Sequence, residues 1–305
     1  MRLVFAGTPS AAVPTLRRLA AEHDIAAVVT RPDAPLGRKR VLTPSAVAQA
    51  AEELGLPVVK AARLDDEATA TIAAVGAELG VIVAYGGLVR EPLLSTPARG
   101  WINLHFSLLP AWRGAAPVQR ALIAGDAELG ASVFQLVPAL DAGDVFATRV
   151  VEVPAEATAD VVLDTMAVAG AGLTAEVVAG IADGTAVAVP QSGTPTLAPK
   201  LALDDGLLDW AEPVDRVFAR FRGVTPEPGA HTTVDGLRVK VLEASPTEEE
   251  PLAPGEIVAT KRTLLIGTAT HPLAVARVQP AGKGAMSAVD WWRGQRRPEG
   301  LRAGA

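Results

Sequence analysis

The sequence predicts an α/β domain followed by a smaller β-rich domain, and three observations support this fold class. Short apolar runs alternate with amphipathic helical segments through the first half, and short β-rich runs follow near the end. Apolar residues make up 49% of the chain and charged residues 20%, which allows packed cores and excludes disorder as the main state. The length of 305 residues suits about two domains of roughly 150 residues each.

The first domain is expected over residues 1–189. Its candidate strands are nearly apolar on both faces and alternate with helical segments, which is typical of a parallel sheet covered by helices on both sides. Such sheets bind ligands beyond the carboxyl ends of their strands. An apolar stripe from Val162 to Ile181 predicts the helix that closes the domain. The candidate strands are Leu3–Phe5, Ile25–Val29, Val58–Val59, Val81–Ala84 and Ile102–Leu104.

A linker and a second domain are expected after it. Residues 190–209 are rich in Pro, Gly, Ser and Thr without a sustained period, which indicates a linker. Residues 210–305 are expected to open with a short helix over Val214–Phe221, and Asp235-Gly236 between β-rich flanks predicts a tight hairpin. Together with the later strands, these signals indicate a small β-barrel. Those strands are expected at Glu256–Thr260, Thr263–Ile266 and Leu273–Val278.

The composition restricts the chemistry. Without cysteine, a disulfide scaffold, a thiolate nucleophile and a Cys-ligated metal are excluded, and no metal site is expected. The chain has no apolar run of about 20 residues, and its N-terminal residues have the pattern of a strand and turn. We therefore expect a cytoplasmic protein that binds no membrane and needs no obligate protein partner. The turn at Gly7 lacks the G-x-G-x-x-G pattern of dinucleotide sites. With a net charge of −6, a polyanion would have to bind local basic patches.

Polar side chains follow two apolar strands between residues 103 and 144. Asn103 and His105 leave one strand end on the same side. Asp141 follows the strand Ser132–Val137, so its carboxylate reaches the same crevice if the two strands are neighbours. An amide, an imidazole and a carboxylate together suit acyl transfer to an amine, with the amide donating to the oxyanion and the imidazole handling the amine proton. The plainer alternative is that His105 is a buried, hydrogen-bonded histidine and Asn103 a strand-end cap.

The string NLHFSLLPAWRGAAPVQRAL at 103–122, with the later LDAGD, resembles the signature of folate-dependent formyltransferases. The resemblance extends along nearly the whole chain, in the form typical of members that act on methionyl-tRNA. Further matching stretches are FAGTP at 5–9, RPDAPLGRKRVLTPS at 31–45, AYG at 84–86, KLALDDGLLDW at 200–210 and KGAMSAVDWW at 283–292.

The resemblance implies a Rossmann-like formyltransferase domain followed by an OB-like barrel. It also implies 10-formyltetrahydrofolate as formyl donor, initiator methionyl-tRNA as amine acceptor, and catalytic roles for Asn103, His105 and Asp141. His105 would stabilise the oxyanion or accept the amine proton. Alternatives are a folate formyltransferase for a sugar-nucleotide amine or a purine precursor, and a catalytically silent RNA-binding protein. By resemblance the folate-contacting residues are Ser107, Leu108, Leu109 and Pro110, although alone this turn would be a plain loop.

Basic residues suited to RNA occur in two places. The prolines and glycine of the loop 31–43 disfavour regular structure, and its only acid is Asp33, so we expect a mobile basic arm for an acceptor stem or else a plain solvated loop. By resemblance Arg38 is the first residue to test. In the second domain Arg238 and Lys240 alternate on one strand face, so a basic barrel face is expected to hold tRNA by its backbone. The candidate tRNA-binding residues of the loop are Arg31, Arg38, Lys39 and Arg40.

Overall fold

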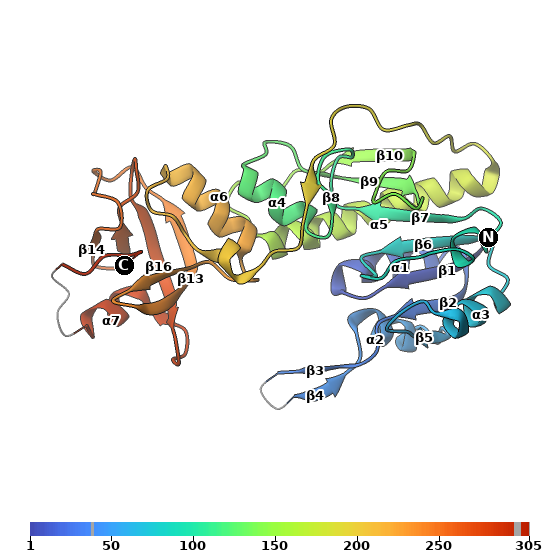
Figure 1. Ribbon diagram of the computed structural model, residues 1–305, viewed down its shortest axis with the longest axis horizontal. Coiled ribbons are helices and arrows are strands. Elements are labelled where there is room, and N and C mark those ends of the chain that lie inside the picture. The colour runs from blue at the N-terminus through green and yellow to red at the C-terminus, as the bar shows by residue number, and fades with distance from the viewer. Residues whose placement is uncertain (38–39, 296–299, 305) are drawn as a thin grey trace. The chain divides into compact units, whose positions relative to one another are not determined.

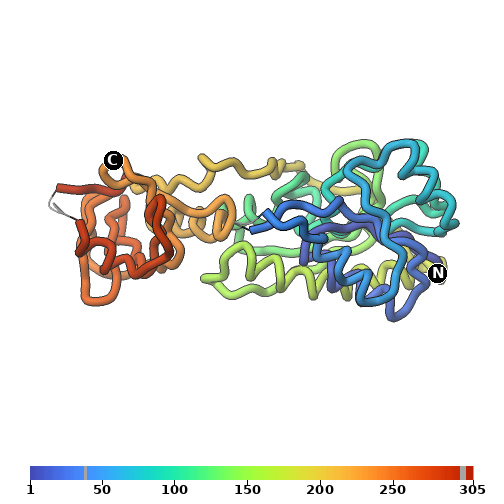
Figure 2. The backbone as a smooth tube through the Cα atoms, turned by 90° about the horizontal axis from the view of Figure 1, so that it is seen from below, coloured from blue at the N-terminus to red at the C-terminus, as the bar shows by residue number. Residues whose placement is uncertain are grey.

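A computed structural model describes residues 1–37, 40–295 and 300–304. By its internal contacts the chain forms two compact units, and the two termini lie in different units (Figure 2). Arg38 and Lys39 lie outside the described residues. The linear domain boundaries expected near residues 189 and 210 stay a prediction. Unit 1 comprises Met1–Pro117, Glu128–Glu152 and Leu163–Ala198, and unit 2 comprises Val118–Ala127, Val153–Val162 and Pro199–Ala305.

Unit 1 is built on a seven-stranded sheet, which confirms the predicted α/β class (Figure 1). The five strands from β7 to β5 are parallel, while β9 and β10 are antiparallel to their neighbours. All five candidate strands of the first half form, because runs of buried apolar residues suit a sheet covered on both faces. In order across the sheet the strands are β10 (Val145–Val150), β9 (Gly130–Gln135), β7 (Trp101–His105), β6 (Leu79–Val83), β1 (Arg2–Gly7), β2 (Asp24–Thr30) and β5 (Val58–Lys60).

Helices cover both faces of this sheet. Ile72 of α3 (Asp66–Ala74) and Leu93 of η2 (Leu93–Ser95) belong to the apolar cluster on one face, with Val4 and Ile82. α5 (Ala159–Asp183) lies against the other face at Leu104: a Cβ on Gly170 would come 2.8 Å from the Leu104 side chain. The remaining helices, α1 (Val13–Ala20) after η1 (Ser10–Ala12) and α2 (Ala46–Glu53), contact each other and β2.

Among the described residues, α5 is the one helix long and apolar enough to cross a membrane. Its predicted stripe from Val162 to Ile181 is buried except at the half-buried Ala169, and 56% of its most apolar window lies inside the fold. Arg99 donates a hydrogen bond of 3.0 Å to the carbonyl oxygen of Ile181 in the last turn of α5. The C-terminal end of a helix is a favourable place for a cation. The helix therefore packs as a core element of the sheet.

The segment 31–43 is not the irregular loop that was expected. β3 (Ala34–Leu36) and β4 (Val41–Thr43) pair as an antiparallel hairpin. Gly37 and Arg40 have φ of 69° and 51°, which supply the left-handed conformations of the turn. Pro35 is tolerated because a two-stranded hairpin leaves one backbone edge of each strand without a neighbouring strand.

Unit 2 contains an antiparallel sheet in barrel-like form, as predicted. Asp235 and Gly236 form the predicted tight turn, with φ of 51° and 69°. Arg302 and Ala303 bridge to Glu256 beside β14 and to Val234 of β12, so the C-terminal segment joins the two edges of the sheet. The strands in order are β12 (His231–Val234), β13 (Leu237–Pro246), β16 (Leu273–Pro280), β15 (Leu264–Ile266) and β14 (Ile257–Ala259), and β17 (Met286–Ser287) pairs with β16.

Helices and tryptophans complete the core of unit 2. Trp210, Trp291 and Trp292 are buried in one apolar cluster with the inner residues of the sheet, so the paired tryptophans serve packing. The helices are α4 (Pro117–Ala124), η3 (Leu203–Gly206), α6 (Val214–Val224) and α7 (Ala288–Arg293).

Part of the expected linker folds back onto unit 1. β11 (Leu197–Ala198) pairs in parallel with β8 (Arg113–Gly114). β8 lies within the signature string at residues 103–122. The Thr196 hydroxyl accepts a hydrogen bond from the Trp112 amide at 2.8 Å. Residues 191–198 therefore belong structurally to the signature region, although their composition resembles that of a linker.

Candidate active site

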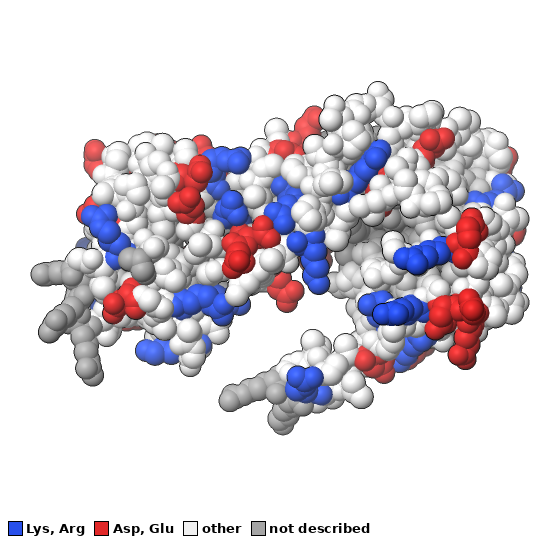
Figure 3. All heavy atoms as spheres, viewed as in Figure 1, with Lys and Arg blue, Asp and Glu red and all other residues white. Residues whose placement is uncertain are grey.

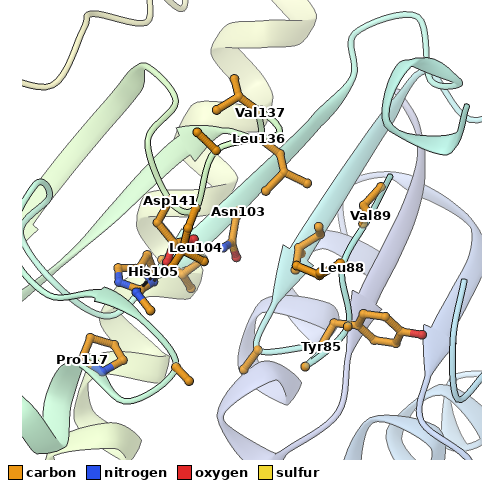
Figure 4. A pocket seen from close by; sticks show the side chains of 18 of the residues that line it. Tyr85, Leu88, Val89, Asn103, Leu104, His105, Pro117, Leu136, Val137 and Asp141 are labelled. Atoms are coloured by element: carbon orange, nitrogen blue, oxygen red, sulfur yellow. Dashed lines mark hydrogen bonds and ion pairs between the residues drawn. The ribbon is translucent and has the colours of Figure 1, made fainter. Parts of the chain in front are cut away.

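A cavity of about 480 Å³ opens beyond the carboxyl ends of β6 and β7 in unit 1. One wall carries Asn103, His105 and Asp141, and Leu88 and Val89 stand on the facing wall (Figure 4). The cavity lies where parallel α/β sheets usually bind ligands, because strand ends project their last side chains into a crevice there. The three polar residues expected to converge from the sequence do share one cavity.

Asn103 presents a buried amide to this cavity. It lies on β7, one strand position before the buried Leu104 and on the same side of the sheet as Ile82. Within the described residues its Oδ1 is buried without a hydrogen-bond partner. A buried amide oxygen that lacks a partner costs free energy unless a bound molecule supplies one, so Asn103 has the properties of a ligand-facing group.

His105 is buried at the end of β7 and has a defined tautomer. Its Nε2 lies 2.9 Å from the carbonyl oxygen of Trp112. A carbonyl oxygen only accepts hydrogen bonds, so Nε2 carries the proton and the neutral ring keeps its lone pair on Nδ1. Trp112 has a φ of 60°, an unusual conformation for this residue, which strains the backbone that presents the carbonyl.

Asp141 faces His105 from the loop after β9. Its Oδ2 accepts a hydrogen bond from the Gly114 amide at 2.7 Å and lies 3.9 Å from His105 Nδ1. The latter distance is too long for a hydrogen bond, as expected when a carboxylate oxygen faces a lone pair. Proton uptake at Nδ1 would turn this contact into an ion pair. Asp141 therefore provides charge for the protonated imidazole rather than a bond to the neutral one.

Burial keeps His105 neutral in the free protein. Desolvation lowers the pKa of His105 below its ordinary value, and the charge of Asp141 and the hydrogen bond to the Trp112 carbonyl oppose this shift only in part. The neutral ring keeps an unprotonated Nδ1 that can accept a proton, and the lowered pKa makes His105 a weaker base than a free imidazole until Asp141 compensates the charge.

The turn Ser107–Pro110 lies beside the cavity but does not line it. Ser132 of β9 donates to the Ser107 carbonyl at 2.7 Å, and its oxygen accepts from the Leu109 amide at 3.1 Å. Leu108 packs against Gly130. The cavity is instead lined by Ala84–Val89 and Leu136–Leu140, two loops that the site prediction missed. The AYG string at 84–86 was the available sequence signal for the first of them.

The basic residues expected on the hairpin have different environments. Arg31 donates to the carbonyl of Ala62, so it holds the hairpin base to the adjacent loop. Asp33 forms an ion pair with Lys60 at 2.7 Å. Arg40 is exposed in the turn. Of the four expected tRNA contacts, Arg40 is the one described residue with a solvent-exposed side chain.

Comparisons with known proteins define the class of this chain. Residues 1–178 match the family model described as formyl transferase, and residues 200–296 match the model of its C-terminal domain. The chain belongs to the formyl transferase family. This match confirms the resemblance that was seen in residues 103–122.

Within that family, relatives of high identity are methionyl-tRNA formyltransferases. A methionyl-tRNA formyltransferase of Clavibacter sepedonicus is 64% identical over 296 residues, which cover 96% of this chain and 97% of the relative. A methionyl-tRNA formyltransferase of Streptomyces coelicolor is 48% identical and covers both chains completely.

Solved structures of lower identity share the fold. The N-formyltransferase of Helicobacter canadensis in complex with folinic acid and dTDP-3-aminofucose has a TM-score of 0.69 at 14% identity, over 90% of this chain and 98% of that one. HypX from Aquifex aeolicus in complex with tetrahydrofolic acid has a TM-score of 0.58 at 17% identity, over 95% of this chain and 46% of that one.

Proposed function

We propose that this chain transfers the formyl group of 10-formyltetrahydrofolate directly to the α-amine of initiator methionyl-tRNA. Formyl transfer to methionyl-tRNA is the activity named for relatives at 48–64% identity over nearly the full length. The observation that carries the mechanism is the arrangement of Asn103, a neutral His105 with an unprotonated Nδ1, and Asp141 around one cavity.

His105 acts as the proton carrier in this mechanism. The neutral amine attacks the formyl carbon, and its surplus proton passes to Nδ1, the ring nitrogen without a carbonyl partner. The imidazolium then lies against the Asp141 carboxylate, which offsets the cost of charging a buried ring. When the carbon–N10 bond breaks, the same proton moves to the departing nitrogen. Proton and charge balance without a covalent enzyme intermediate.

Asn103 has the role of oxyanion donor. Attack on the formyl carbon places negative charge on its oxygen, and the amide NH2 of Asn103 stabilises that charge by a hydrogen bond. The oxygen and nitrogen ends of an amide are assigned from their hydrogen-bond partners, and Asn103 Oδ1 has none among the described residues. No such bond therefore fixes which end of the amide faces the ligand.

The cavity of about 480 Å³ lies within the usual volume range of small-molecule sites, and its lining supports the proposal of a folate ligand. Leu88, Val89, Leu136 and Val137 give it apolar walls for flat rings, and the three polar residues lie together on one side. Contacts of Ser107, Leu108, Leu109 and Pro110 with folate stay a prediction, and they would require the ligand to extend beyond the lined cavity.

The tRNA would be held by exposed basic side chains. Figure 3 shows lysine and arginine side chains among acidic ones on the visible face, including the β3–β4 hairpin. On β13, Arg238 is exposed, Lys240 is half-buried, and Val239 between them points into the core, as the alternation predicted. We assign the hairpin residues Arg31, Arg38, Lys39 and Arg40, with β13, to tRNA binding.

We also propose that the reaction takes place in the cytoplasm without a metal, membrane or obligate protein partner. Charged tRNA as substrate supports this location, and proton transfer by His105 supplies the chemistry without a Lewis acid. Chelator-treated protein should therefore keep its full activity.

The test is direct formylation. The protein is incubated with 10-formyltetrahydrofolate and methionyl initiator tRNA, and the tRNA is hydrolysed and analysed for formyl-methionine. Methionyl elongator tRNA and a dTDP-linked amino sugar serve as competing acceptors. Formyl-methionine on initiator tRNA supports the proposal, whereas preference for the amino sugar would assign the chain to another substrate class.

A further inference from the structure

Gln191 binds the loop that carries Asp141. Its Nε2 donates to the carbonyl oxygens of Asp141 and Gly143, both at 2.8 Å. Its Oε1 accepts from the Arg113 guanidinium, at 2.6 Å from Nη2 and 3.2 Å from Nε. The side chain is half-buried and comes from the segment whose composition predicted a linker.

The partners fix the orientation of this amide. A guanidinium can only donate, so the oxygen of Gln191 must face Arg113. Both hydrogens of the NH2 group are then used by carbonyls two residues apart on the Asp141 loop. Every polar atom of the Gln191 side chain therefore has a hydrogen-bond partner. Its two donors bind backbone carbonyls of the Asp141 loop, as a neighbouring strand would do within a sheet.

Arg113, which binds the Gln191 amide, lies between the two residues whose backbone groups bind His105 and Asp141. The residue before it, Trp112, provides the carbonyl that binds His105 Nε2, and the residue after it, Gly114, provides the amide that binds the Asp141 carboxylate. The distance between the imidazole and the carboxylate therefore depends on three consecutive residues. Gln191 ties the backbone of Asp141 to the central one.

The Asp141 loop needs such support. Asp141 has a φ of 45°, a left-handed conformation that few non-glycine residues adopt and that Asp and Asn tolerate best. A Cβ on Gly143 would lie 1.7 Å from the carbonyl oxygen of Gln135, so the loop approaches β9 very closely. A strained loop keeps its conformation only when its surroundings hold it.

We propose that Gln191 is a positioning residue that, together with Arg113, holds the Asp141 carboxylate at its distance from His105. This inference rests on the proposed roles of His105 and Asp141. Gln191 itself does not line the cavity, so its effect on the reaction passes through Asp141.

The test is a double-mutant cycle of Gln191→Leu and Asp141→Asn, with Ser192→Ala as the matched control in the same exposed segment. In steady-state assays, Gln191→Leu should lower kcat about 10- to 100-fold and leave KM for 10-formyltetrahydrofolate within about twofold. In the Asp141→Asn background it should change kcat less than about twofold. Ser192→Ala should change neither quantity.

A spectroscopic readout separates positioning from general damage. In NMR titrations, the pKa of His105 should fall in Gln191→Leu toward its value in Asp141→Asn, because a displaced carboxylate raises that pKa less. Gln191→Glu keeps the shape and the Arg113 contact but loses both donors, so it should reproduce the kcat loss if the leucine variant fails to fold.

Two results would overturn the inference. Equal kcat losses from Gln191→Leu with and without Asp141→Asn would show that Gln191 acts independently of Asp141. Wild-type kcat in both Gln191 variants would show that the loop does not need it. If Asp141→Asn itself retained normal turnover, the proposed function of Asp141 would fail first, and the cycle distinguishes these cases.

Discussion

At the residue scale, the distance between the His105 imidazole and the Asp141 carboxylate determines whether the imidazole can accept a proton. The imidazole donates through Nε2 to a backbone carbonyl and keeps Nδ1 at 3.9 Å from a carboxylate oxygen. With Nε2 donating to the carbonyl, a shorter hydrogen-bonded pair would require a second proton on the ring, and the resulting imidazolium could not accept another. The separation is therefore consistent with a base that becomes charged during the reaction.

The Asp141→Asn substitution tests this arrangement. Asparagine tolerates positive φ, and its oxygen can keep the hydrogen bond from the Gly114 amide, so folding and folate binding should persist. Removing the charge should lower single-turnover transfer by about 10²- to 10⁴-fold, the usual range for proton-transfer catalysis. Rapid-quench measurement of formyl-methionyl-tRNA gives the rate. Turnover within a few-fold of wild type would exclude Asp141 from the mechanism.

The buried His105 also predicts a pH dependence of stability. Its pKa is lowered in the folded state, so the unfolded chain binds the proton more readily. The stability associated with a neutral ring is fully present above the unfolded pKa of about 6.5 and is lost as the pH falls through the lower folded value. Urea unfolding at pH 7.5 and 5.5 should show a larger loss for the wild type than for His105→Gln.

His23, whose pKa is also lowered by burial, is present in both proteins and cancels in that comparison. An identical loss in wild type and variant would mean that His105 is not held neutral.

At the scale of elements, the C-terminal segment closes the sheet of unit 2. The Ala303 amide donates to Gly255 and the Gly304 amide to Thr233, both at 2.8 Å. These bonds join residues beside β14 and within β12, the two edge strands. Backbone bonds of this kind contribute roughly 0.5–1.5 kcal/mol each, so the segment has a measurable effect on stability.

Gly255 provides a test of this closure. Its φ is 75°, and a Cβ would lie 2.4 Å from the carbonyl oxygen of Ala303. Gly282 has nearly the same φ, 77°, with no atom within 4 Å of its Cβ, and is the matched control. Gly282→Ala should cost about 1–2 kcal/mol from backbone strain alone. Gly255→Ala should cost more, because it also displaces the C-terminal segment.

Thermal and urea unfolding of both alanine variants measure the difference. Equal losses of unfolding free energy would show that contact between Gly255 and the C-terminal segment does not stabilise unit 2.

At the scale of the whole molecule, a net charge of −6 must be reconciled with a tRNA substrate. The overall field repels a polyanion, so binding has to come from local groups such as Arg238, Lys240 and Arg40. Other arginines of unit 2 are already used: Arg120 pairs with Asp205, and Arg222 donates to the Ala157 carbonyl. The available basic residues are thus fewer than the composition suggests.

Salt dependence measures how many of them bind phosphates. Raising salt from low to physiological concentration should weaken tRNA binding steeply, with each neutralised phosphate adding about 0.7–0.9 to the slope of log K against log salt. Arg238→Gln and Lys240→Gln should each reduce that slope by close to one unit. Arg18→Gln, at an exposed ion pair with Glu22 in unit 1, should leave it unchanged. A flat response in the wild type would count against these contacts.

Local patterns in the sequence were sufficient for the five parallel strands and β9 of unit 1, the α5 stripe, the Asp235-Gly236 turn and the placement of Asn103 and His105 at one strand end, whereas β10 was not predicted. These features depend on the spacing of residues along the chain and on the alternation of side chains along a strand. The position of Asp141 does not follow from the strand-end rule, because β9 is antiparallel to β7 and its carboxyl end lies beside the amino end of β7. The loop after β9 brings Asp141 back toward His105. The hairpin at 34–43 was missed because prolines and a glycine are compatible with a two-stranded ribbon as well as with a loop.

The contacts that orient the site were decided only by the tertiary structure. Gln191 binds the carbonyl of Asp141, which lies 50 positions away in the sequence. The His105 tautomer depends on the carbonyl of Trp112, a residue with a strained backbone. No periodicity or turn signal encodes such contacts, because they arise when distant segments pack and each buried polar group must find the nearest available partner.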